Sequence, residues 1–215
     1  MTRPPMRPDD LPTTAALCRD TLTPWLDRDW SLPAGDLEWS CRRTLDHVSD
    51  CQIFLGGNAA MRSSARVLPA RNGDANAELP ATLDAVVTTA TMLERICAGM
   101  APGDRGFHPA GRADAEGFRA QGCAEIVQHI YDIARGFGET FRAPEDLAER
   151  ITARLFPWAP DADEHADRWE ALLWCSGRIA LPGRDRLDAD WWILAAPLDE
   201  WDGQRKVRTM PPGWR

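Results

Sequence analysis

The stretch Gly122–Gly138, GCAEIVQHIYDIARGFG, combines a helical pattern with a possible metal half-site. Its apolar residues recur at spacings of three and four, which indicates a helix with one buried face. These residues are Ile126, Val127, Ile130, Ile133 and Ala134. Gly136 and Gly138 supply the signal that ends a helix. We therefore predict a long helix here, packed against a core.

Two polar side chains of the same stretch stand one helical turn apart. Glu125 and His129 are separated by four residues, so on a helix they project toward the same point, as the ligands of a metal ion must. Asp132 lies on the same flank and could orient a ligand or serve as one. An ordinary pair on a helix surface is the simpler alternative for this stretch taken alone.

Composition bounds the class of protein. A chain of 215 residues with 44% hydrophobic and 27% charged residues is typical of a globular domain with one main core. The net charge of −8 argues against a general nucleic-acid partner, because phosphate recognition requires basic residues. Six dispersed cysteines predict buried, reduced thiols, and no apolar run reaches bilayer length, so we expect a cytoplasmic protein without a membrane partner.

Four long helices are expected in residues 11–140, after a tail at residues 1–10. The first extends to about Asp29 with a kink at Pro24, and the second starts at Trp39 or Ser40 and continues to about Leu55. Residues 61–78 are predicted to be a long loop. Pro80 opens the third helix, Gly99 ends it, and the stretch quoted above forms the fourth.

The remainder is predicted to be a Trp-rich extension, residues 141–203, and a basic tail, residues 204–215. A helix should run from Pro144 to Pro157, another should start near Ala166, and residues 190–196 could form a short strand. Seven of the ten tryptophans lie beyond residue 155 and would cover one end of the helices or form an interface. These are Trp158, Trp169, Trp174, Trp191, Trp192, Trp201 and Trp214. The expected fold class is thus mainly α, a four-helix bundle with this extension.

A further histidine could complete a metal site. His47 lies at the edge of the apolar stripe of the second helix, and neighbouring helices of a bundle could bring it to Glu125 and His129. Two imidazoles and a carboxylate leave one coordination position open, as in catalytic sites. Such a set suits zinc, and nickel, iron or manganese are alternatives.

Two motifs carry a resemblance to a known family. Residues 39–48, WSCRRTLDHV, place Trp39 eight residues before His47, and residues 125–138, EIVQHIYDIARGFG, contain Glu-x-x-x-His followed by Asp. In order and spacing they resemble the DinB-like superfamily, in particular the mycothiol-dependent maleylpyruvate isomerase N-terminal domain, over roughly residues 10–140. The resemblance implies a DinB-like four-helix bundle with His47, Glu125 and His129 as metal ligands.

The resemblance also implies an activity. The metal would activate mycothiol, a low-molecular-weight thiol cosubstrate, for attack on a small electrophile, as in a transferase or isomerase. The family's isomerase carries a catalytic arginine in a further C-terminal domain, which the Trp-rich extension does not match, and Arg178 or Arg184 could replace it. His108 could act as an acid, base or substrate contact, and Asp50 could support His47.

Two further expectations follow from the family. A DinB-like bundle often pairs, which favours a homodimer. The alternative function is a non-catalytic DinB-like protein that binds a metal or a ligand, or that is associated with stress.

Overall fold

The computed structural model describes residues 3–67, 74, 76–160 and 166–208, and this part of the chain is mainly helical. Its helices are α1 (Asp10–Leu22), α2 (Cys41–Met61), α3 (Leu79–Ala98), α4 (Ala115–Gly136), α5 (Glu145–Leu155) and α6 (Arg168–Cys175). Two 3-10 turns, η1 (Thr23–Trp25) and η2 (Leu198–Glu200), complete the regular structure of the described ranges. The prediction of a mainly α fold is confirmed.

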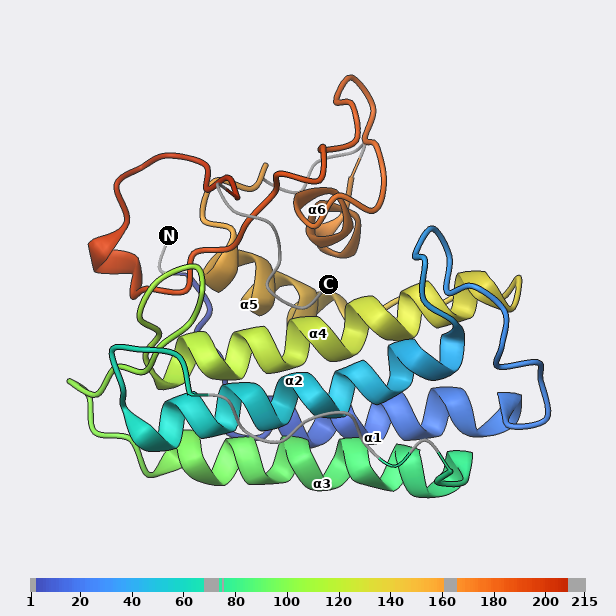
Figure 1. Cartoon of the computed structure of the whole chain (residues 1–215). Coiled ribbons are helices and arrows are strands. Elements are labelled where there is room, and N and C mark those ends of the chain that lie inside the picture. Colours follow the sequence, from blue (N-terminus) through green and yellow to red (C-terminus); the bar gives the residue numbers. More distant parts are fainter. Residues whose placement is uncertain (1–2, 68–73, 75, 161–165, 209–215) are drawn as a thin grey trace.

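The four long helices lie side by side (Figure 1). Both α1 and α2 contact α3 and α4, and α3 also contacts α4. On the other side of α4, α5 packs against it and α6 packs against α5. Helix α4 therefore lies between the long helices and the C-terminal part of the chain.

This central position explains the burial of α4. The five apolar residues that predicted its buried face are all at most 1% exposed. Burial extends further around the helix than one face, because α5 covers the side that the long helices leave open. The sequence periodicity predicted the helix correctly and underestimated how much of it is covered.

Polar caps fix the starts of the two helices that carry the candidate ligands. The Ser40 side chain accepts a hydrogen bond from the backbone N–H of Arg43 at the start of α2. The Asp114 side chain does the same for Gly117 in α4. Each cap satisfies an N–H group that has no partner within the helix, and so defines where the helix begins.

Close contact around Gly122 leads to a stability prediction. A Cβ atom at Gly122 would lie 2.7 Å from Gln52 Oε1 and from Leu11 Cδ2, and 2.9 Å from Leu93 Cδ2. Gly122→Ala should therefore destabilise the fold by about 1–3 kcal/mol through overpacking. Denaturant unfolding measures the effect, and Gly103→Ala, where no atom lies within 4 Å, is the control. Equal stability of the two variants would contradict this packing.

Two predicted elements differ from the structure. Helix α1 ends at Leu22, and η1 follows it, because Pro24 has no N–H to continue the helical pattern. Residues 190–196 do not form the expected strand, and Trp191 makes an isolated bridge with Val207. The backbone there bonds to α5 instead, since Leu194 N–H donates to the carbonyl of Leu155.

The predicted tails make defined contacts with the rest of the chain where they are described. Arg3 forms a two-bond ion pair with Glu116, and Met6 is buried. At the other end, Arg208 lies over the Trp192 ring, 4.2 Å from its centroid. Trp214 and the rest of the basic tail after residue 208 lie outside the described ranges.

The six cysteines are free thiols, as predicted. Five are buried, and Cys51 is half-buried. Burial raises the pKa of the Cys18, Cys97 and Cys175 thiols to about 12, which keeps them protonated and unreactive. Within the described ranges, none of the helices combines the length and apolarity that a membrane crossing requires.

Candidate metal centre

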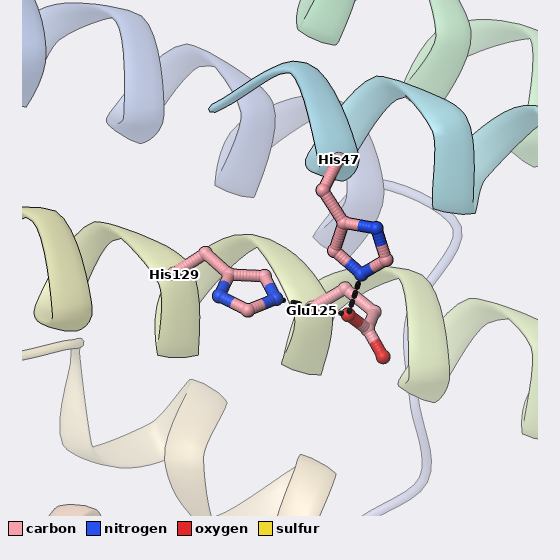
Figure 2. Close-up of side chains that lie close together, drawn as sticks. All are labelled: His47, Glu125 and His129. Atoms are coloured by element: carbon pink, nitrogen blue, oxygen red, sulfur yellow. Dashed lines mark ion pairs between the residues drawn. The ribbon is translucent and has the colours of Figure 1, made fainter. Parts of the chain in front are cut away.

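Helices α2 and α4 bring the three predicted metal ligands together (Figure 2). His47 projects from α2, and Glu125 and His129 project from α4. Glu125 Oε2 lies 3.3 Å from His129 Nε2 and 3.7 Å from His47 Nε2. One ligand atom from each residue lies within 4.8 Å of the others, so this group could hold a metal ion.

The chemistry of the group fits a divalent metal. Zinc–nitrogen and zinc–oxygen bonds of about 2.0–2.2 Å in a tetrahedral site place the ligand atoms about 3.3–3.6 Å apart. The two distances to Glu125 Oε2, 3.3 and 3.7 Å, are close to this spacing. Two imidazoles and one carboxylate also match the ligand types that zinc accepts in catalytic sites.

Asp132 fixes the orientation of His129. Asp132 Oδ2 lies 3.0 Å from His129 Nδ1, which leaves Nε2 directed toward Glu125. Arg178 in turn donates to both carboxylate oxygens of Asp132, over 3.0 and 2.7 Å, and to Gln128 Oε1 over 3.1 Å. A carboxylate bonded to a histidine ligand holds its ring and selects its tautomer, so this contact would let Asp132 orient His129 in a metal site.

Charges keep both carboxylates ionised. Burial alone would raise the pKa of Glu125, but the hydrogen bond and charge of His129, together with His47 and Arg178, lower it to about 2. Burial likewise opposes the ionised form of Asp132, and Arg178 and His129 outweigh it and lower that pKa. Burial disfavours the charged form of His129, whereas Asp132 and Glu125 favour it, and its pKa is raised. The Glu125 carboxylate is thus ionised, and a metal ion bound here would take the place of the proton on His129.

The role of Asp132 can be tested by substitution. Asp132→Asn should lower the affinity for zinc about 10- to 100-fold, because the amide can neither stabilise nor orient the His129 ring as the carboxylate does. Competition with a chromophoric chelator measures the affinity. Asp36→Asn is the control, because Asp36 lines the same cavity and also pairs with arginines. Equal losses in the two variants would mean that Asp132 acts through overall charge alone.

A cavity of about 1040 Å³ opens beside the three residues. Its wall combines the middle of α2 and α4 with loops and the C-terminal segment. The lining residues that matter for the argument are Trp39, His47, Cys51, His108, Glu125, His129, Arg178, Trp192 and Arg208. A small molecule in this cavity would therefore reach the candidate ligands, aromatic rings and guanidinium groups at once.

The remaining predicted residues take different positions. His108 lines the cavity, its Nδ1 accepts a hydrogen bond from the N–H of Ala110, and burial lowers its pKa to about 4, so it is neutral. Arg178 also lines the cavity, whereas Arg184 lies over the Trp174 ring. Of the two arginines, Arg178 is thus the one brought to the site.

Asp50 connects to His47 through two intermediate side chains. Asp50 is buried, and its Oδ2 atom lies 3.4 Å from the guanidinium of Arg43. Arg43 lies over the Trp39 ring, whose centroid is 4.7 Å from that of the His47 ring. Trp39, the first residue of the motif that ends at His47, therefore packs directly against the candidate ligand.

Sequence reasoning missed three residues of the site. Cys51 stands four residues after His47, the same spacing as Glu125 and His129, and this signal could have identified it. Trp192 and Arg208 reach the cavity from segments predicted as a strand and a tail. No local sequence pattern predicts that these two residues line the cavity, because their position depends on contacts with distant parts of the chain.

Comparisons with protein families, with curated proteins and with solved structures found no match for this chain. The geometry of the site is therefore the evidence for function.

Proposed function

We propose that this chain is a metal-dependent enzyme with a DinB-like four-helix bundle, which uses a mycothiol-type thiol as a transferase or isomerase of small electrophiles. The observation that carries the proposal is the group His47, Glu125 and His129 at the wall of a cavity of about 1040 Å³. A purely structural metal site is normally closed by four protein ligands, whereas three ligands beside a cavity favour chemistry. The two sequence motifs support the same family.

The three residues would hold a divalent ion, most suitably zinc, with nickel, iron or manganese as alternatives. Such an ion stabilises the thiolate form of a bound thiol and thereby supplies a nucleophile at neutral pH. Asp132 keeps the His129 Nε2 atom directed into the site. Arg178, held by Asp132 and Gln128, adds a fixed positive charge at the cavity wall.

Other side chains of the cavity would position the reactants. Trp39 and Trp192 offer apolar faces, and Arg208, which lies over Trp192, offers a guanidinium group for an anionic part of the thiol or substrate. His108 is neutral, with Nδ1 engaged by a backbone N–H, so its Nε2 carries the proton and can donate a hydrogen bond. These roles require the cavity to admit the thiol and the electrophile together.

Calorimetric titration with mycothiol tests the proposal. Zinc-loaded protein should bind the thiol, and metal-free protein should not. A screen of small electrophiles with the loaded protein then measures thiol consumption, with His129→Ala as the inactive control. If the thiol binds equally with and without zinc, or does not bind at all, the thiol chemistry is refuted. A metal- or ligand-binding protein without catalysis would then be the better description.

A further inference from the structure

The two carboxylate oxygens of Glu125 have different surroundings. The Oε2 atom faces the imidazoles, 3.3 Å from His129 Nε2 and 3.7 Å from His47 Nε2. The Oε1 atom accepts a hydrogen bond of 2.6 Å from the side-chain amide of Gln121. Figure 2 shows the two oxygens pointing in different directions, with one of them toward the histidines. Only one oxygen of this candidate ligand is thus presented to the place of a metal ion.

Gln121 is positioned for this contact by its place on α4. It precedes Glu125 by four residues, so the two side chains lie on the same side of the helix. Both residues line the cavity. Within the described ranges, Gln121 Oε1 is buried and accepts no hydrogen bond, so the amide bonds to Glu125 while its own carbonyl oxygen stays unpaired.

The chemistry of an amide fixes which of its ends faces the carboxylate. A carboxylate that binds a metal ion is ionised and can only accept hydrogen bonds. The Gln121 NH₂ group can donate to it, whereas the Gln121 carbonyl in the same place would set two acceptors against each other. The hydrogen bond also holds the plane of the carboxylate, as partners of metal-binding carboxylates commonly do.

We infer that Gln121 is a positioning residue that makes Glu125 bind the divalent ion through Oε2 alone. This role rests on the proposed metal site. A carboxylate that bound through both oxygens would fill a second coordination position beside the two histidines. Binding through one oxygen leaves that position for the small thiol that the proposed function requires.

Cobalt spectroscopy tests this role without measuring activity. The protein is loaded with Co²⁺ in place of zinc, and the visible d–d bands of the wild type should have the high intensity of a four-coordinate site. Gln121→Met has a side chain of similar length and no donor. Its Glu125 Oε1 atom should join the ion, and the bands should lose intensity because five-coordinate cobalt absorbs more weakly than tetrahedral cobalt.

Gln52→Met is the matched control. Gln52 is a buried glutamine of α2 whose amide donates to the carbonyl of Gly122 on α4 over 3.0 Å. Its loss removes a glutamine hydrogen bond to the same helix, next to Gln121 in the sequence, without removing the bond to Glu125. We expect this variant to keep the band intensity of the wild type.

The outcomes separate this role from the proposed function. If Gln121→Met keeps the wild-type spectrum, or if both variants lose intensity equally, Gln121 does not set the binding mode and the metal site itself stands. A wild type that binds neither cobalt nor zinc refutes both proposals. If Gln121→Met does not fold, crystals of the zinc-loaded wild type decide. Zinc bound by Oε2 alone, with Oε1 bonded to Gln121, is expected, and zinc bound by both oxygens would overturn the assignment.

Discussion

Replacing His129 with alanine is expected to lower the affinity of the chain for zinc more than about 100-fold, beyond the effect of losing a supporting carboxylate. His129 contributes a ligand atom 3.3 Å from Glu125 and is itself oriented by Asp132. Its loss leaves two of the three predicted ligands, which cannot define a stable site. Titration of the metal-free protein with zinc, followed by plasma mass spectrometry of the dialysed sample, measures the change.

The matched control for this experiment is His108→Ala. His108 is another histidine at the wall of the same cavity, and it lies outside the group of three. We expect this variant to retain zinc at the wild-type level. If both variants lost zinc equally, the ion would be held by the cavity in general and not by His47, Glu125 and His129.

The largest effect on stability is expected from Arg154→Met. The Arg154 side chain is fully buried and donates to Asp114 Oδ1 over 2.7 Å and to the carbonyls of Leu194 and Ala195 over 3.1 Å each. It therefore joins α5 to the start of α4 and to the segment that reaches the cavity. Methionine is apolar and shorter, so the substitution removes the three hydrogen bonds of the buried guanidinium, at a cost of about 3 kcal/mol in the free energy of unfolding.

An exposed ion pair provides the comparison for Arg154. Arg28 pairs with Glu139 over 2.6 Å at the surface, so Arg28→Met should cost less than about 1 kcal/mol. Denaturant unfolding of both variants, followed by circular dichroism, gives the two values. Unfolding of both at the same denaturant concentration would show that the buried network does not hold the C-terminal part in place.

The sequence was most informative where local patterns determine structure. Apolar spacing and the Ser40, Pro80 and Gly99 signals placed the start of α2, both ends of α3 and the end of α4 within about two residues. Helix α2 continues past Leu55 to Met61, and α4 begins at Ala115, before Gly122. The helical pattern also predicted that Glu125 and His129 lie together, because residues four apart on a helix project from the same side. His47 was added on the assumption that its helix lies beside α4, which the contact between α2 and α4 supports.

Prediction from the sequence was weakest for residues whose positions depend on tertiary contacts. Trp192 and Arg208 belong to segments without helical periodicity. Their place at the cavity depends on their contact with each other and on the hydrogen bond from the Leu194 backbone to α5. The expected strand failed for a related reason, since β-branched and aromatic residues form a strand only beside a partner. Here the Arg154 guanidinium donates hydrogen bonds to the carbonyls of Leu194 and Ala195, which in a sheet would accept hydrogen bonds from a neighbouring strand.

Anomalous X-ray diffraction from crystals of the zinc-loaded protein, with data collected on both sides of the zinc absorption edge, tests whether these three residues bind the ion. We expect one strong anomalous peak at about 2.0–2.2 Å from ligand atoms of His47, Glu125 and His129. Absence of a peak at this position, or a peak held by other residues, would contradict it.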